Sequence, residues 1–325
     1  MVEALAQPAR GRYALVAPSR DEGRTLRRTL DSLLAQTVPP ALLVVVDDGS
    51  TDDTPAILAD YAARMPYLRV VRRPDRGGRS VGPGVIEAFN AGVAALRLDD
   101  VEFLCKLDMD VDLPPGYFEG LMARMDADPA LATCSGKPFF PDPRTGALVS
   151  EHIGDPFSVG MTKFYRVSAW LAIGGFPTSI GWDGIDCHLC RMRGLRAESF
   201  SDPELAFVHL RPMGSSHLSL WHGRKRHGLG AWVMGTPPLF MLVATAYRLN
   251  KRPRITGALG MLWGYHEARR RGVPRFDAPG YLAFVRRYHL WALLIGRARA
   301  AERMRRSAAA EAGPPPLARQ SHAGA

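Results

Sequence analysis

The chain has 325 residues, of which 46% are hydrophobic and 23% are charged. This length suits one large domain or two ordinary ones, and the composition is typical of a globular protein. The first twelve residues are polar and alanine-rich and lack the basic and apolar regions of a secretory signal. Four cysteines suit a reducing compartment, so these features predict an intracellular protein rather than a secreted one.

Charge is divided unevenly along the chain. Residues 1–209 contain 22 Lys and Arg against 28 Asp and Glu, a net charge of −6, and residues 210–325 contain 20 against 4, a net charge of +16. Together they give the +10 of the whole chain. The pattern predicts an acidic body suited to metal binding and a basic last third that favours an anionic surface, either nucleic acid or lipid headgroups.

Strand and helix patterns alternate through the first half of the chain. Apolar runs predict buried strands at residues 13–17, 42–46, 68–71, 103–107 and 131–134. Helical spacing of apolar residues predicts helices at about 21–35, from Thr54 as N-cap with Pro55 first in the helix, over 85–96, and over 117–125. We therefore expect an α/β fold with a largely parallel sheet, whose functional groups gather outside the carboxyl ends of the strands.

The strand at 103–107 is followed by Asp108, Asp110 and Asp112. On extended backbone these carboxylates point the same way, because side chains alternate with a period of two. Grouped carboxylates favour Mg²⁺ or Mn²⁺, which keep open positions for water and substrate phosphates. A solvated strand end, with one aspartate capping the next helix, is the alternative interpretation.

The other predicted strands also end in polar or charged residues. The first ends at residues 19–22, the second at Asp47 and Asp48, and the third leads into a basic loop with Arg76 and Arg79. A scaffold built for stability alone does not need such residues at every strand end. The pattern therefore favours a binding site at this edge of the sheet.

At these positions the chain resembles the family 2 glycosyltransferases of the GT-A fold. The matching segments are Ala17–Glu22, Val46–Thr54 and Leu107–Phe118, and the resemblance covers about residues 12–212. It implies an α/β, Rossmann-like GT-A fold with a mostly parallel mixed sheet and helices on both faces. It also implies transfer of a sugar from a nucleotide-sugar donor, with Mg²⁺ or Mn²⁺ bound at the D-x-D motif.

The resemblance implies a role for each matching residue. Donor contacts would come from Pro18, Arg20, Glu22, Asp47, Asp48, Arg76, Arg79 and Asp108. Asp108 and Asp110 would hold the metal, with His209 as a third ligand or a diphosphate contact; a structural role for His209 is the alternative. Asp112 is additional and is expected at the start of the next helix.

The catalytic base is expected in the segment from Gly181 to Asp186. This segment resembles the family's acidic motif, in which Glu-Asp precedes a helix and a glycine, although Trp182 stands where the Glu is usual. Counting back from Gly194 places Asp183 at the catalytic position, and Asp186 is the near alternative. Either could instead serve as a helix N-cap.

The basic last third is expected to form a helical region from 213 to 308, followed by a disordered tail from 309 to 325. Its apolar stretches, 239–247 and 255–265, are shorter than the roughly 20 residues that a membrane span needs. Arginines border both, which favours helices lying on an anionic membrane surface. A spanning helix and a helical subdomain with a solvated basic face are the alternatives.

Together these patterns predict a metal-dependent, inverting glycosyltransferase whose catalytic domain is 1–212. The Gln-x-x-Arg-Trp motif of processive relatives is absent around residues 223–228, which predicts the addition of single sugars. The acceptor would be a glycan or a lipid-linked molecule at the cytoplasmic face of the cell membrane. A sugar-phosphate nucleotidyltransferase is one alternative, but its glycine-rich signature after the first strand is missing. Nucleic-acid binding leaves the acidic strand ends unexplained, so no nucleic-acid partner is expected.

Overall fold

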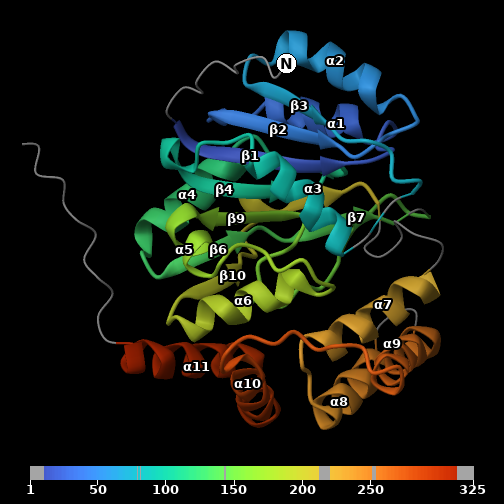
Figure 1. The fold of residues 1–325 in the computed structure, drawn as a ribbon, viewed down its shortest axis with the longest axis vertical. Helices are drawn as coiled ribbons and strands as arrows, with labels where there is room; N and C mark the ends of the chain where they lie inside the picture. The colour runs from blue at the N-terminus through green and yellow to red at the C-terminus, as the bar shows by residue number, and fades with distance from the viewer. Residues whose placement is uncertain are drawn as a thin grey trace, which may run out of the picture.

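The computed structural model describes residues 11–78, 80, 82–142, 144–211, 220–250 and 254–312. A seven-stranded sheet forms its centre (Figure 1). The strands, in spatial order, are β10 (Arg196–Ser199), β6 (Leu131–Ser135), β9 (Thr162–Arg166), β4 (Val101–Leu107), β1 (Gly11–Ser19), β2 (Leu42–Asp47) and β3 (Leu68–Arg72). Only β9 runs antiparallel to its neighbours, β4 and β6. The predicted α/β fold with a mostly parallel sheet is confirmed.

A smaller sheet lies at the edge where the main strands end. Its strands, in spatial order, are β5 (Val111–Asp112), β11 (Phe207–His209), β7 (Pro138–Pro141) and β8 (Leu148–Ser150). Strand β11 pairs antiparallel with β5, and His209 lies opposite Val111. This register brings residues almost a hundred positions apart in the sequence next to the segment that follows β4.

Helices cover both faces of the main sheet. One face is covered by α1 (Leu26–Leu34), α2 (Thr54–Arg64) and α4 (Tyr117–Ala127), and the other by α3 (Pro83–Val93), α5 (Val167–Ala172) and α6 (Trp182–Met192). Two short 3₁₀ helices span Leu98–Asp100 and Pro203–Leu205. Because both faces are covered, continuous apolar runs rather than alternating ones form the central strands.

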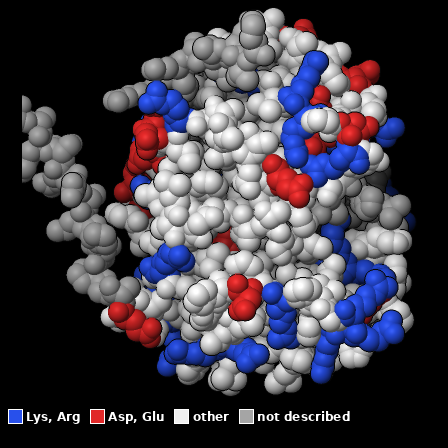
Figure 2. Space-filling model, in the orientation of Figure 1, with Lys and Arg blue, Asp and Glu red and all other residues white. Residues whose placement is uncertain are grey.

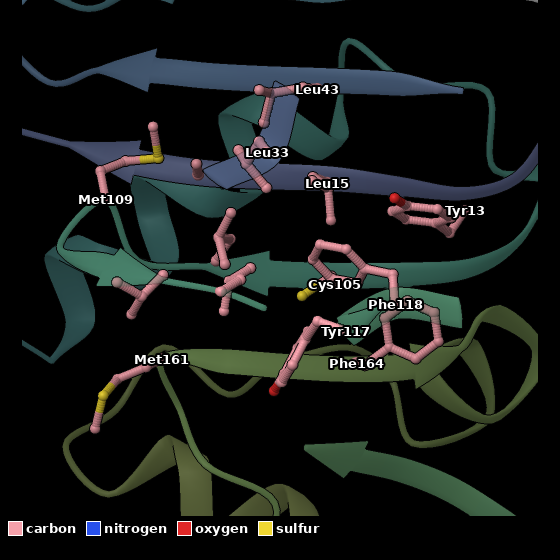
Figure 3. Packing of buried hydrophobic residues seen from close by; sticks show 14 of the residues in the cluster. Tyr13, Leu15, Leu33, Leu43, Cys105, Met109, Tyr117, Phe118, Met161 and Phe164 are labelled. Carbon is pink, nitrogen blue, oxygen red and sulfur yellow. The ribbon is translucent and has the colours of Figure 1, made fainter. Parts of the chain in front are cut away.

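Aromatic rings fill the core on the first of these faces. Tyr13 of β1 stacks on Phe118 of α4 with ring centroids 4.8 Å apart, and Phe164 of β9 lies 6.0 Å from Tyr13 (Figure 3). All three side chains are fully buried. Burial of each large apolar side chain contributes about 1.5–3 kcal/mol, so this cluster holds the strands that carry the site in a fixed register.

Five helices lie on the side of the molecule that α6 covers, and α10 and α11 pack against α6 (Figure 1). They are α7 (Leu220–Val233), α8 (Pro238–Arg248), α9 (Arg254–Arg270), α10 (Tyr281–Ile295) and α11 (Arg297–Ala312). Tyr281 and Val285 of α10 join the core beneath α6, and a separate apolar cluster ties α8 to α10 and α11. The predicted helical C-terminal region is thus present and packs on the sheet domain.

The backbones of helices α7 and α9 lie in close contact where the two helices cross. A Cβ atom on Gly228 would lie 1.9 Å from the carbonyl oxygen of Met261, and one on Gly264 would lie 2.0 Å from that of Lys225. Any larger residue at either position would force the two backbones apart. Within the described residues, no helix is long enough and apolar enough to span a bilayer.

Four local predictions need correction. Helix α1 begins at Leu26, because residues 20–25 turn away from β1 and direct Glu22 toward the site. Asp53, not Thr54, is the N-cap of α2, and the Thr54 hydroxyl accepts a hydrogen bond from the Glu22 amide at 2.8 Å. Asp112 lies in β5 and pairs with Arg28 at 2.8 Å, so it does not start a helix. Helix α11 continues to Ala312, into the segment predicted as a tail.

Candidate active site

A cavity of about 680 Å³ opens at the carboxyl ends of the parallel strands. Of the predicted site residues, Pro18, Arg20, Glu22, Asp48, Asp108, Asp110, Asp183 and His209 line it. Asp47 is buried behind this lining, and Arg76 is an exposed residue that does not line the cavity. Asp186 lies in the interior, and Arg79 lies outside the described residues. Segments far apart in the sequence thus contribute to one cavity.

Arg211 links the carboxylates from two strand ends. Its Nη2 lies 2.7 Å from Glu22 Oε2 and 2.7 Å from Asp110 Oδ2, and its Nε donates to Asp110 Oδ2 at 2.9 Å. The Glu22 and Asp110 side chains are less than a tenth exposed. A guanidinium that bridges two buried carboxylates offsets the repulsion between them.

His209 lies between two further carboxylates. Its Nδ1 lies 3.1 Å from Glu151 Oε2, and its Nε2 lies 3.5 Å from Asp110 Oδ2. Burial alone would lower the pKa of His209, but hydrogen bonds to Asp110 and Glu151 raise it to about 9. Burial would likewise raise the pKa of Asp110, yet His209 and Arg211 hold it well below its usual range. Glu151 therefore orients the imidazole so that Nε2 faces Asp110.

Asp108 is paired with Lys106, two residues earlier on β4. The Lys106 ammonium contacts the Asp108 carboxylate and donates to the Gly160 carbonyl at 3.0 Å, and its side chain is 3% exposed. Burial raises the pKa of Asp108, and the charge of Asp110 adds to the rise against the opposing effect of Lys106. Both residues line the cavity, so a ligand at the end of β4 can contact an ammonium and a carboxylate together.

Asp48 is held by the basic loop that follows β3. Its Oδ1 accepts from Arg73 Nη1 at 2.8 Å and from Arg76 Nη2 at 2.9 Å. Gly49 makes this contact possible: its φ is +77°, and a Cβ there would lie 2.4 Å from the Asp75 Cα. The loop can therefore lie directly against the end of β2.

Arg20 and Asp47 support the same strand end. Arg20 donates to the Asp48 carbonyl at 2.7 Å and to Asp75 Oδ1 at 2.7 Å. Asp47 accepts from the Ser50 amide at 2.9 Å and is 4% exposed, so it shapes the turn after β2. Arg20 lines the cavity, whereas Asp47 stabilises the backbone behind it.

The two candidate bases lie in different surroundings. Asp183, in the first turn of α6, is exposed and lines the cavity. Asp186, one turn later, is fully buried; it accepts from Lys163 Nζ at 2.7 Å and from the Tyr165 hydroxyl at 2.5 Å. Because the Asp186 oxygens are buried and paired, their position favours Asp183 as the residue that meets an acceptor. Neither is the N-cap, which is Gly181.

Trp182, which takes the place of the expected Glu, lies beside two lysines. Its ring centroid is 5.3 Å from Lys106 Nζ and 5.7 Å from Lys163 Nζ. The aromatic face attracts both cations electrostatically. Trp182 therefore joins the lysine that contacts Asp108 to the lysine that contacts Asp186.

The residues around Asp110 fit a divalent metal ion that a ligand completes. Among the described residues, no three Asp, Glu, His or Cys side chains converge into a metal site on their own. Asp110 and His209 nevertheless face one another, and Mg²⁺ or Mn²⁺ commonly takes one or two protein carboxylates together with substrate phosphates. In the present structure, the positive charge beside Asp110 comes from protonated His209 and from Arg211. A bound metal ion would supply this charge instead.

Several lining residues were not found from the sequence. Lys106 stands inside an apolar strand pattern, and Arg211 adjoins the predicted His209 without any motif of its own. Arg226 and His227 of α7, and residues of α8 and α10, also line the cavity. Their contribution depends on how the helices pack, which their local sequence does not reveal.

A family model described as Glycosyl transferase family 2 matches residues 14–176, just over half of the chain. The chain belongs to this family. The predicted glycosyltransferase is thereby favoured over the nucleotidyltransferase and the nucleic-acid-binding protein. The matched segment contains the ends of β1, β2 and β4, whereas Asp183, His209 and the C-terminal helices lie beyond it.

The curated relatives are similar to this chain over only part of their length. Validoxylamine A glucosyltransferase of Streptomyces hygroscopicus subsp. limoneus is 34% identical over 146 residues, 42% of this chain and 30% of that protein. Chondroitin synthase of Escherichia coli is 29% identical over 119 residues, 37% of this chain and 16% of that protein. The chain thus spans about a third or less of the length of these relatives.

Solved structures share the fold over almost the whole chain. A mannosyltransferase from Pyrobaculum calidifontis in complex with GDP-Man and Mn²⁺ has a TM-score of 0.52 and 21% identity, covering 94% of this chain and 88% of that one. S. aureus TarS 1-349 in complex with UDP-GlcNAc has a TM-score of 0.53 and 15% identity, with 91% of each chain covered. These likenesses confirm the GT-A fold with its helical C-terminal region.

Proposed function

We propose that the chain transfers one sugar from a nucleotide-diphosphate sugar to a hydroxyl acceptor, with inversion at the anomeric carbon and with a divalent metal ion. The observation that carries the proposal is the single cavity that brings the Asp183 carboxylate together with the charged ends of β1, β2 and β4. Donor binding and proton removal can then occur at one place.

The donor would lie along the strand ends. Carboxylates of Glu22 and Asp48 can accept from the N–H groups of a base and from ribose hydroxyls, and Arg20 and Lys106 can donate to ribose or phosphate oxygens. Each of these residues already has a partner that fixes its orientation. Such fixed polar groups stabilise a bound nucleotide without costly rearrangement.

Asp110 and His209 would hold the metal ion, with Asp108 at its side. A divalent ion bound there would offset the negative charge that develops on the leaving diphosphate. The chain's own contribution is to keep these donors oriented: Glu151 fixes the His209 ring, and Lys106 fixes Asp108. Mn²⁺ in the complex of the mannosyltransferase from Pyrobaculum calidifontis supports a divalent ion in this fold.

Asp183 would act as the base. As the acceptor oxygen forms its bond to the anomeric carbon, the hydroxyl proton passes to an Asp183 carboxylate oxygen, and the bond between that carbon and the diphosphate oxygen breaks with its electron pair. Attack from the side opposite the diphosphate inverts the configuration.

The C-terminal helices would attach the enzyme to the inner face of the cell membrane. Large apolar side chains are exposed on neighbouring helices, for example Leu239 and Leu242 of α8 at 62% and 56%, and Ile255 and Trp263 of α9 at 66% and 59%. Lysines and arginines gather around these helices (Figure 2). An exposed apolar surface with a basic border is typical of a protein that lies on an anionic bilayer.

Isothermal titration calorimetry with UDP, GDP and dTDP tests the donor and metal roles. At least one nucleotide should bind with Mn²⁺ or Mg²⁺ and bind at least tenfold more weakly in EDTA. Equal binding in EDTA contradicts the metal role of Asp110. A panel of nucleotide sugars, assayed for metal-dependent release of the diphosphate, then identifies the donor; no release and no binding of any member overturns the proposed function.

A further inference from the structure

The lining of the cavity changes character between its two ends. At the strand ends it is charged. At the C-terminal helices it contains the apolar and aromatic side chains of Phe157, Phe240, Met241, Ala244 and Tyr288, interspersed with polar residues that include Arg226, His289 and Arg297. A nucleotide sugar has hydroxyls and phosphates along most of its length, and those that face the apolar side chains would be left without partners. The apolar end therefore suits a different ligand.

Helix α8 is apolar on both of its sides. Phe240 and Met241 face the cavity and are 8% and 2% exposed, while Leu242 and Val243 point outward at 56% and 47%. A helix that separates a cavity from water normally carries polar residues on its outer side. Here an apolar surface leads from the outside of the molecule to the wall of the cavity.

Two polar side chains at this end, Tyr288 and Arg226, can each contact a ligand in the cavity. The Tyr288 hydroxyl is buried and has no hydrogen-bond partner in the described part of the chain. Arg226 is half-buried and lines the cavity together with Asp183, and among the described residues no carboxylate lies within ion-pair distance of it. A buried hydroxyl without a partner is unfavourable, and a guanidinium without a carboxylate can bind an anion, so both groups indicate a ligand with acceptor oxygens.

We propose that the acceptor is an amphiphile in which an aliphatic chain is joined through phosphate to the group that receives the sugar. The chain would lie against Phe240, Met241 and Ala244, and the phosphate would contact Arg226. The receiving hydroxyl would then lie near Asp183, which lines the same cavity as Arg226. This inference rests on the proposed function, because it places the receiving group at the proposed base.

Arg297 supports an anionic and apolar ligand at the same end. Its guanidinium lies 5.3 Å from the ring centroid of Phe240 and lines the cavity. An arginine over an aromatic ring has an apolar face toward the ring and donors toward the cavity. Lipid phosphates combine the two chemistries that this end offers.

Binding of decyl phosphate and of ethyl phosphate tests the proposal, each measured by calorimetry below the concentration at which the longer probe forms micelles. The nucleoside diphosphate identified above is kept at saturation so that the donor end is filled. Decyl phosphate should bind with one-to-one stoichiometry and at least tenfold more tightly than ethyl phosphate, because each buried methylene contributes about 0.8 kcal/mol. Equal affinities overturn the proposal.

Two substitutions of alanine by tryptophan on α8 locate the site. Ala244→Trp fills the apolar end and should abolish the preference for the longer chain, whereas Ala246→Trp, on the exposed side of the same helix, should leave it unchanged. Nucleoside diphosphate affinity should stay within about twofold in both. Retention of the preference in Ala244→Trp contradicts the assignment.

Arg226→Gln gives an independent test if Ala244→Trp does not fold. It should weaken decyl phosphate at least tenfold and leave decanol binding unchanged, because only the phosphate would contact Arg226. If Arg226→Gln instead weakens the nucleoside diphosphate alone, Arg226 belongs to the donor end and the acceptor assignment is wrong. If wild-type protein binds decyl phosphate but no nucleotide, the failure is that of the proposed function.

Discussion

The two ends of the cavity shift the pKa of histidine in opposite directions. At the sheet, Asp110 and Glu151 raise the pKa of His209 to about 9. At the helices, burial lowers the pKa of His289 to about 4 and, with the help of neighbouring arginines, that of His227 to about 4. One end is thus a network of paired charges and the other excludes charge from its histidines, which separates the handling of a nucleotide from the handling of an apolar group.

Replacement of the proposed base should have the largest effect at the junction of the two ends. Asp183→Asn should lower the rate of transfer by about 10²–10⁴, the usual contribution of a positioned general base. Nucleoside diphosphate affinity should stay nearly unchanged, because the charged strand ends are intact. Rate and affinity are measured on the same preparation. An active Asp183→Asn together with an inactive but folded Asp186→Asn would move the base to Asp186.

Asp186 should instead affect stability. Asp186→Asn leaves the Lys163 ammonium buried without its counter-charge and should lower the free energy of unfolding by about 3–5 kcal/mol, measured by urea denaturation. Lys163→Met combined with Asp186→Asn removes both charges and should recover part of the loss. A single variant as stable as the wild type would show that the buried pair does not support α6 on the sheet.

The donor end could be predicted from sequence because it depends on strand ends. An apolar run followed by Asp47 and Asp48, or by Asp108 and Asp110, fixes both the strand and the point where its polar residues emerge. The alternation of strands and helices followed from the same signals, and the resemblance to the family 2 glycosyltransferases implied the GT-A fold. Asp183 and Asp186 could not be separated, because three positions on a helix decide which side chain faces the cavity and which faces Lys163.

For the helical end, the sequence predicted only that helices form, and it did not predict which residues line the cavity. Its basic and apolar content indicated helices, but Ala244 and Tyr288 carry no motif, and their place at the cavity depends on the crossing of α8 and α10. The glycines that let α7 approach α9 were visible, yet Gly228 and Gly264 stand 36 positions apart and only their contact reveals the reason for them. Helix packing is a non-local property that apolar spacing does not specify.

Acid should weaken the helical end through its neutral histidine. Burial lowers the pKa of His289 to about 4 against the hydrogen bond to the Val285 carbonyl, with Arg297 adding to the decrease; His188 and Tyr288 pack beside it. The unfolded value is about 6.5, so the stabilisation is complete above pH 6.5 and is lost as the pH falls toward 4, roughly 3 kcal/mol in all. Urea denaturation between pH 7.5 and 4.5 measures this slope. His289→Gln should flatten it, and an unchanged slope would assign the acid sensitivity to other groups.

Attachment of the helical end to lipid should have the smallest effect for each residue, about 1 kcal/mol for a basic side chain near an anionic surface. The protein should co-sediment with vesicles that contain phosphatidylserine, and 0.5 M salt should weaken this binding because it screens the basic border. Trp263→Glu should reduce it several-fold. Leu148→Glu, at an equally exposed apolar residue on β8, should not, because β8 belongs to the sheet domain. A wild-type protein that stays in solution at low salt refutes attachment, whereas equal losses in both variants would show that any new negative charge, rather than the outer side of α9, governs binding.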